Sequence, residues 1–134
     1  MKIVLDANVI IAAFASRGLC ESILEFCLSE HEIILCADLL AEIVRNLRLK
    51  IRLPVAAVDS IKDLLQEYGT MLDPLPLPHD ACRDSDDVKV LGLAVASSAD
   101  FVVTGDKDLL ILEKWQGIPI LSPRSFSQVI HSEA

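Results

Sequence analysis

The sequence predicts an α/β protein built around a parallel sheet, and three observations support this prediction. Short runs rich in Ile, Val and Leu alternate with longer segments whose apolar residues recur at helical spacing, a pattern typical of βαβ units. Hydrophobic residues make up 52% of the chain, enough for a core, whereas aromatic residues make up only 4%. The length of 134 residues fits a single domain over residues 1–134.

Strands are expected where apolar and β-branched residues form short runs, because strands buried on both faces show no polar alternation. These runs cover residues 2–6, 32–36, 101–104 and 118–121. Helices are expected where apolar residues recur every three or four positions. They cover residues 8–16, 19–30, 38–48, 54–69, 86–98 and 124–131, with a short helix near 107–113. The connection 73–84 contains three prolines, so it is expected to be extended.

The charge balance argues against a protein that simply coats nucleic acid. The chain carries 20 acids against 12 Lys and Arg, a formal net charge of −8, and sequence-independent binding depends on cations that meet phosphates. One stretch is locally basic and contains no acid: Arg45, Arg48, Lys50 and Arg52. This stretch is either a solvated helix end or a surface that steers RNA phosphates.

The sequence shows neither a zinc motif nor a membrane span. The four cysteines, at positions 20, 27, 36 and 82, lack zinc-site spacing. We interpret them as small buried hydrophobic residues in a reducing compartment. The apolar run 9–14 is too short to cross a bilayer, and no secretory leader is visible. A soluble, cytoplasmic protein without a membrane partner is expected.

The distribution of carboxylates carries the functional prediction. Asp6 follows the run Ile3–Leu5, and Asp106 follows the run at 101–105. The carboxyl ends of parallel strands form the ligand crevice of an open α/β sheet, so both acids should meet at one edge. Glu42 lies off the apolar face of the helix at 38–48, together with Asn46, and can point toward that edge. Asp87 stands in the first turn of the helix at 86–98.

Acids crowded in this way repel one another, which predicts a divalent cation. Mg²⁺ and similar cations prefer carboxylate oxygens, waters and substrate phosphates, and such metals activate water and neutralise charge in phosphodiester hydrolysis. The predicted cluster comprises Asp6, Glu42, Asp87 and Asp106, with Asp84 and Asp108 as outer members. Purely structural roles remain open: Asp6, Asn8 and Asp108 can each cap a helix. The pair Asp84 and Asp87 has capping-box spacing, and we assign the cap to Asp84.

Four sequence blocks together resemble the PIN-domain family, in particular the VapC-like toxin components of type II toxin–antitoxin systems. The blocks are IVLDANVIIAAF at 3–14, LLAEIVRNL at 39–47, RDSDDVKVLGLAVASSADFVVTGDKDLL at 83–110 and GIPILSPRSF at 117–126. The resemblance implies a three-layer α/β/α sandwich with a central parallel sheet of four to five strands. It also implies a ribonuclease that depends on Mg²⁺ or Mn²⁺.

The family's acids map by resemblance onto Asp6, Glu42, Asp87 and Asp106, as the metal-binding and catalytic set. The flanking polar positions that assist map onto Asn8, Asp84, Thr104 and Asp108. The resemblance further implies a homodimer and an antitoxin inserted at the acidic cleft. Arg45, Arg48 and Lys50 would then help to bind RNA.

The chain departs from the family pattern at several flanking positions. Ala7 stands where a Thr is common, Ala37 where a small hydroxyl residue is common, and Val88 where a further Asp is common.

Two other functions compete with the ribonuclease. A PIN-fold binding module would keep the acids without turnover, acting through a protein or RNA partner. A HAD-like phosphatase fits poorly, because Asn8 replaces the usual general acid and Asp108 follows Asp106 too closely.

Overall fold

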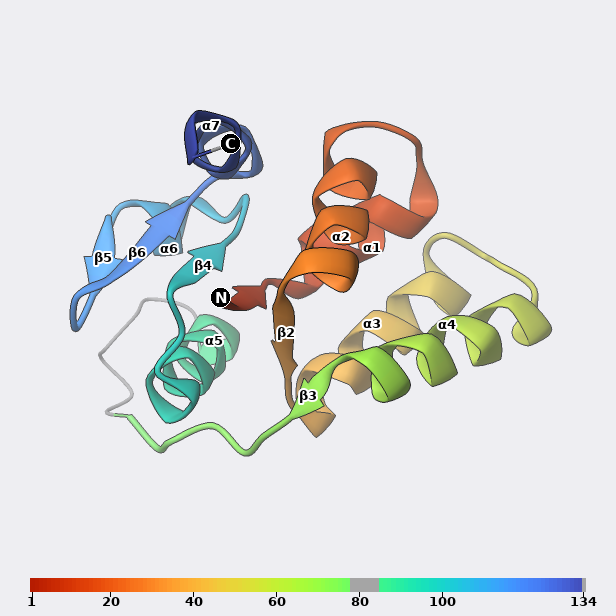
Figure 1. Ribbon diagram of the computed structural model, residues 1–134. Helices are drawn as coiled ribbons and strands as arrows, with labels where there is room; N and C mark the ends of the chain where they lie inside the picture. The colour runs from red at the N-terminus through yellow and green to blue at the C-terminus, as the bar shows by residue number, and fades with distance from the viewer. Residues whose placement is uncertain (78–84, 134) are drawn as a thin grey trace.

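A six-stranded sheet organises the molecule, as seen in a computed structural model that describes residues 1–77 and 85–133 (Figure 1). The strand order across the sheet is β3-β2-β1-β4-β6-β5. The strands are β1 (Lys2–Leu5), β2 (Glu32–Leu35), β3 (Thr70–Met71), β4 (Phe101–Val103), β5 (Lys114–Trp115) and β6 (Ile118–Leu121). The helices are α1 (Ala7–Ala15), α2 (Leu19–Glu30), α3 (Ala37–Leu49), α4 (Val55–Tyr68), α5 (Ser85–Ser97), α6 (Lys107–Leu110) and α7 (Pro123–Glu133).

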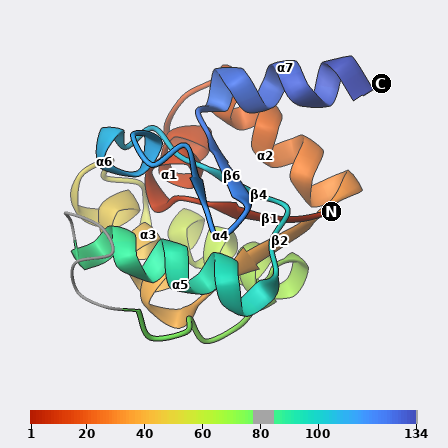
Figure 2. The ribbon, with the colours of Figure 1, turned by 90° about the vertical axis from the view of Figure 1, so that its left-hand side faces the viewer.

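Helices cover both faces of the sheet, which gives the predicted three-layer α/β architecture. Helices α2 and α7 lie on one side and α5 on the other (Figure 2). Helix α1 packs against both α2 and α3, and α3 packs against α4 beyond the β3 edge. The strands are accordingly buried on both faces: Ile3, Val4, Leu5 and their neighbours in β2 and β4 are almost inaccessible, as expected for a covered parallel sheet.

The parallel part of the sheet comprises five strands, as predicted, and β5 adds a sixth, antiparallel strand at one edge. β3 pairs with β2 in parallel, whereas β5 pairs with β6 antiparallel, so the sheet is mixed at that edge. β3 and β5 are each only two residues long, and strands this short leave no apolar run in the sequence. The β5–β6 hairpin turns at Gln116 and Gly117, whose φ angles are +48° and +83°. Two positive φ angles are typical of a type I′ turn, which matches the twist of antiparallel strands.

The cysteines of the described region are packing residues. Cys20, Cys27 and Cys36 are free thiols, and the last two are buried. Burial raises the pKa of Cys27 to about 12, so its thiol stays protonated and unreactive at neutral pH. Cys82 lies outside the described residues.

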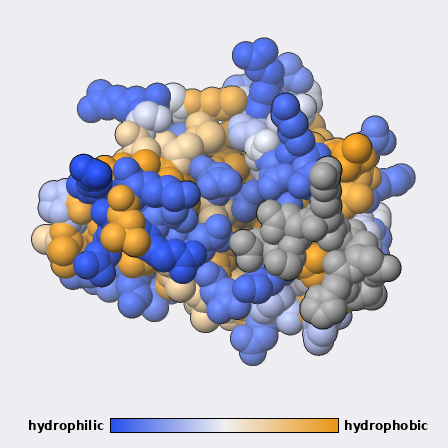
Figure 3. All heavy atoms as spheres, turned by 180° about the vertical axis from the view of Figure 1, so that it is seen from behind, coloured by the Kyte–Doolittle hydropathy of each residue, from blue (hydrophilic) through white to orange (hydrophobic). Residues whose placement is uncertain are grey.

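None of the helices in the described ranges is long and apolar enough to cross a membrane. On the face seen in Figure 3, exposed apolar side chains form separate patches among hydrophilic ones.

The start of the proline-containing connection packs against α5. Residues 72–77 form neither helix nor strand, and the Leu75 N–H donates a hydrogen bond to the Gly92 carbonyl at 3.0 Å. A side chain at Gly92 would collide with the Leu75 backbone, so the glycine permits this close approach. The contact anchors the chain that leads toward the amino end of α5.

Candidate functional site

The carboxyl edges of β1 and β4 bring distant polar residues together. The two strands are parallel neighbours, with Leu5 opposite Val103, and the Asp6 N–H donates to the Val103 carbonyl at 2.9 Å. Asp6 and Thr104 therefore follow paired strands directly. Asp6 is only 7% exposed although its side chain is polar. A buried carboxylate needs hydrogen bonds or a cation to offset its lost hydration.

The Thr104 hydroxyl links the ends of the two strands. It donates to Asp6 Oδ2 at 2.7 Å and accepts from the Asp106 N–H at 3.0 Å. Thr104 is inaccessible to solvent, so neither bond competes with water. Asp6 occupies the N-cap position of α1, but its side chain makes no capping hydrogen bond. The hydroxyl thus holds the Asp6 carboxylate at the sheet edge rather than over the helix end.

Asp106 caps the short helix α6. Its Oδ1 accepts the Asp108 N–H at 2.8 Å, which makes Asp106, rather than Asp108, the side-chain cap of this helix. The bond leaves the other carboxylate oxygen of Asp106 for further partners, and it turns the chain so that Asp108 comes back toward the sheet edge.

Three carboxylates converge at this edge. One oxygen from each of Asp87, Asp106 and Asp108 lies within 4.8 Å of the others, and Asp87 is only 5% exposed. Asp87 reaches the cluster from the first turn of α5, which packs against β1 and β4. Within the described part of the chain, Asp6 and Glu42 are outside this set of mutually close oxygens, but Asp6 is connected to Asp106 through Thr104.

The crowding of these oxygens has a direct electrostatic consequence. Negatively charged oxygens at such separations repel one another, and a cation bound among them offsets that repulsion. An all-oxygen donor set suits hard cations such as Mg²⁺ and Mn²⁺. The burial of Asp87 strengthens this point, because the cluster is not simply a group of solvated surface acids. The donors present therefore fit the predicted divalent metal.

Glu42 faces a pocket between α3 and α5. The pocket has a volume of about 180 Å³, and its lining includes Glu42, Arg45 and Lys89. Lys89 Nζ lies 3.3 Å from Asp38 Oδ2, so an ion pair joins the first turn of α3 to the second turn of α5. The Asn46 side-chain amide donates to the Glu42 backbone carbonyl at 2.9 Å.

The remaining predicted residues lie in different environments. Asn8 is exposed on the first turn of α1. Asp84 lies outside the described residues. Arg45, Arg48 and Lys50 are all exposed on α3 or at its end, but only the first two line a larger pocket between α3 and α4, with a volume of about 510 Å³.

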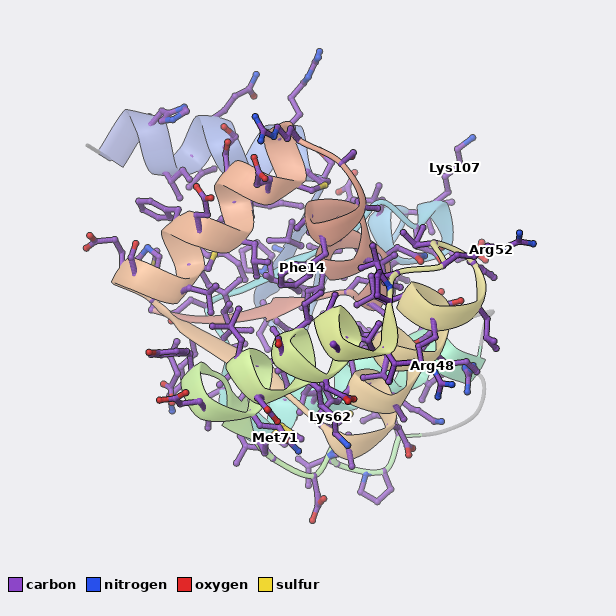
Figure 4. All side chains as sticks on the ribbon, turned by 90° about the vertical axis from the view of Figure 1, so that its right-hand side faces the viewer. Phe14, Arg48, Arg52, Lys62, Met71 and Lys107 are labelled. Carbon is purple, nitrogen blue, oxygen red and sulfur yellow. The ribbon has the colours of Figure 1, made fainter. Side chains whose placement is uncertain are left out.

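Sequence reasoning missed two cations that the fold places near these pockets, Lys62 and Lys89. Lys89 stands two positions after Asp87, and this spacing could have flagged it. Lys62 is one of several charged residues on the exposed side of α4, and nothing in the sequence distinguishes it from the others as a pocket residue. Figure 4 shows Arg48, Lys62 and Met71 on the side of the molecule formed by α3 and α4, with Lys107 projecting away on α6.

Comparisons with known proteins agree with this geometry. The model of a family described as PIN domain matches residues 2–108. A search of curated proteins found no significant match. Three solved structures share the fold at low sequence identity.

The first is VapBC2 from Rickettsia felis bound to a promoter DNA fragment, with 15% identity, TM-score 0.63, and coverage of 91% of this chain and 98% of that one. The second is FitAcB from Neisseria gonorrhoeae, with 16% identity, TM-score 0.57, and coverage of 91% and 98%. The third is the PIN domain endonuclease Utp24, with 21% identity, TM-score 0.54, and coverage of 90% and 84%.

Proposed function

The chain belongs to the PIN domain family, and from this premise we propose that it is a divalent-metal-dependent endoribonuclease that hydrolyses RNA phosphodiester bonds. The observation that carries the proposal is the convergence of Asp87, Asp106 and Asp108, with one oxygen of each inside 4.8 Å. Family membership supports nuclease chemistry, and the similarity to a structure described as a PIN domain endonuclease is consistent with it.

Asp6, Asp87 and Asp106 would hold Mg²⁺ or Mn²⁺, with Asp108 as an additional ligand and Glu42 completing the set directly or through water. A divalent ion bound there would polarise the phosphate and lower the pKa of a bound water. Asp108 enters this set because its carboxylate lies among the others. Asn8 and Asp84 keep supporting roles in the proposal.

The protein's own residues orient the acids and the substrate. The Thr104 hydroxyl holds Asp6 by a 2.7 Å bond, so Asp6 need not lose rotamer freedom when a ligand binds. The Asp108 N–H fixes Asp106 through Oδ1. On the α3 side, Arg45 and Lys89 flank Glu42 in one pocket. These two cations would neutralise phosphates that approach the acidic edge, with Arg48 and Lys50 extending the attraction along the α3 end.

We further propose that the chain is the toxin of a cytoplasmic toxin–antitoxin pair, acts as a homodimer, and is blocked by a small protein partner. The support is the fold shared with the structures of VapBC2 and FitAcB. The test is co-expression with the product of the adjacent open reading frame. Stable co-purification and suppression of RNA cleavage are expected, and a chain that remains unbound and uninhibited contradicts this part of the proposal.

The nuclease proposal is tested by cleavage of a labelled RNA in Mg²⁺, in Mn²⁺ and in EDTA. The wild type should cleave only with metal, and Asp6→Asn should be inactive at equal protein concentration. Asp63→Asn, which removes an exposed acid from α4, serves as the matched control and should keep full activity. Equal inactivity of wild type and Asp6→Asn with both metals would favour the silent binding module.

A further inference from the structure

A cation-lined pocket lies between α3 and α4. Its volume is about 510 Å³, and its lining combines apolar, cationic and amide side chains. Its lining includes Leu40, Ala41, Arg45, Arg48, Lys62 and Gln66. We infer that this pocket is a subsite for one unpaired nucleotide of an RNA strand, next to the pocket that contains Glu42. The inference rests on the proposed function, because it assumes that RNA is the substrate.

The charge of the pocket is opposite to that of the protein. Three cationic side chains line it, Arg45, Arg48 and Lys62, and none of the described residues in its lining is acidic. The whole chain carries a formal charge of −8. A local concentration of cations on an acidic protein attracts anions selectively to that place. Phosphates are the anions that Lys and Arg meet in nucleic-acid binding.

The interior of the pocket suits a base. Leu40 is nearly buried at 4% exposure and Val44 is half-buried, so the floor is apolar. Pockets for small ligands start at about 300 Å³, and this pocket exceeds that size. Unstacked RNA bases stack on guanidinium planes and are read along their hydrogen-bonding edges. Arg48 offers such a plane, and the Gln66 amide carries both donors and an acceptor.

The position of the pocket links it to the candidate site. Ala41 and Arg45 line both this pocket and the smaller pocket that contains Glu42. Arg45 therefore stands between a place for a base and the pocket that contains Glu42. A strand with a base over α3 and α4 would pass its next phosphate beside Arg45. A paired duplex could not insert a base in this way, so the inferred ligand is single-stranded.

Apolar side chains near the pocket also fit a peptide, but the observations favour RNA. Leu49 and Met71 line the pocket and are 67% and 38% exposed, which an amphipathic acidic helix could cover. Such a helix would contact the exposed apolar residues and the cations of the pocket. It would not explain the Gln66 amide in the lining or the fact that Arg45 lines both pockets. An acidic peptide and a second copy of the chain are therefore treated as outcomes of the test.

The first experiment measures nucleotide binding in EDTA, so that turnover cannot interfere. Amide signals of the ¹⁵N-labelled full chain are followed during titration with the four nucleoside monophosphates and, separately, with inorganic phosphate. A nucleotide should shift the Gln66 side-chain amide and the signals around Leu40, whereas phosphate alone should shift only residues beside the cations. Identical shifts from nucleotide and phosphate would overturn the inference, because the base would then make no contact.

The second experiment fills the pocket without changing its charge. Ala41→Phe places a large side chain at an exposed helical position in the lining, and Ala56→Phe makes the same change at an exposed position of α4 outside the lining. Anisotropy of a labelled single-stranded RNA in EDTA should report an affinity loss of about tenfold or more for Ala41→Phe, which is within the range for one stacked base. Affinity should be unchanged for Ala56→Phe. Equal affinities would overturn the inference.

The third experiment separates the pocket from general attraction to anions. Lys62→Glu should weaken RNA binding by at least about tenfold more than Lys114→Glu, which reverses an exposed charge on β5 at the opposite edge of the sheet from β3. Comparable losses of RNA affinity in Lys62→Glu and Lys114→Glu would overturn the inference of a subsite. Sedimentation velocity of Ala41→Phe completes the test. If the wild type is a dimer, the variant is a monomer, and both show the same nucleotide-induced shifts, the pocket is a contact between copies and the inference is overturned.

The inferred subsite and the proposed function can fail separately. Nucleotide binding in EDTA without any metal-dependent RNA cleavage would remove the nuclease and keep the subsite. Cleavage that needs metal and Asp6, together with no pocket-specific nucleotide shifts, would keep the nuclease and remove the subsite. Displacement of RNA from the wild type by an acidic antitoxin peptide, with no pocket-specific shifts from nucleotides, would assign the pocket to the peptide.

Discussion

The acidic edge and the α3–α4 pocket differ in the sign of their charge and in how firmly their polar side chains are held. At the acidic edge, Asp6 and Asp87 are almost buried, and the Thr104 hydroxyl hydrogen-bonds the Asp6 carboxylate and the Asp106 N–H. In the pocket, Arg45, Arg48 and Lys62 are exposed on two helices. Buried polar groups held by fixed bonds have little freedom to adapt, whereas long exposed side chains adjust to what binds.

This difference predicts how each region responds to substitution. Changes at the acidic edge should alter chemistry and stability together, because the same carboxylates and hydroxyl are part of the packed sheet edge. Changes in the pocket should alter affinity and its salt dependence while the fold stays as stable as before. Each prediction below compares one region with the other.

The largest effect is expected from the carboxylates that would hold the metal. Asp87→Asn and Asp106→Asn should each lower kcat for RNA cleavage by about a hundredfold or more, since metal-borne charge stabilisation contributes several kcal/mol to the barrier. Single-turnover cleavage at saturating metal measures the loss. Asp63→Asn on α4 should retain wild-type kcat, and a comparable loss there would mean that general charge, rather than the cluster, matters.

The next effect is on thermal stability. Addition of Mg²⁺ or Mn²⁺ at a hundred times its dissociation constant should raise the Tm by roughly 5–10 °C, because ligand binding to the folded state alone adds about 2.7 kcal/mol. Asp87→Asn should abolish this rise, whereas Lys62→Glu should keep it. Differential scanning calorimetry measures the Tm of each protein with and without the metal. A rise that survives in Asp87→Asn would place the metal elsewhere.

A smaller effect is expected from the hydroxyl that joins the two strand ends. Thr104→Val keeps the shape of the side chain but leaves Asp6 Oδ2 and the Asp106 N–H without this partner. The free energy of unfolding should fall by about 1–3 kcal/mol, the usual cost of unsatisfied buried groups. Urea denaturation measures this loss, and Thr104→Ser, which retains the hydroxyl, should restore most of it. Equal stability of Thr104→Val and wild type would refute the linking role.

The smallest effect is expected from a single cation of the pocket rim. Arg45→Ala should reduce RNA affinity several-fold and lower the slope of log affinity against log salt by about one, as expected for one lost phosphate contact. Lys114→Ala should leave the slope unchanged. Titrations in EDTA over a series of salt concentrations measure both slopes. The Tm of Arg45→Ala should remain that of the wild type, which separates this region from the acidic edge.

Sequence reasoning recovered most of the fold because the long elements have clear periodicity. The α3 segment has apolar residues such as Leu39, Ile43 and Leu47 on one face, and all of them are buried. β3 and β5 were missed because pairs such as Thr70–Met71 become strands only when a neighbour supplies hydrogen bonds. At the candidate site, the strand-end position identified Asp6 and Asp106, but the proximity of Asp108 to Asp87 depends on a four-residue helix whose cap is formed by Asp106.

The sequence alone determined the α/β class, the family and the strand ends at which acids stand, because hydrophobic periodicity and a local motif are properties of neighbouring residues. The tertiary structure decided which carboxylates share one small volume, that Thr104 binds Asp6, and that Lys62 joins Arg45 and Arg48 around one pocket. These juxtapositions join residues far apart in the chain. Distances between such residues depend on strand register and helix packing, which no local pattern encodes.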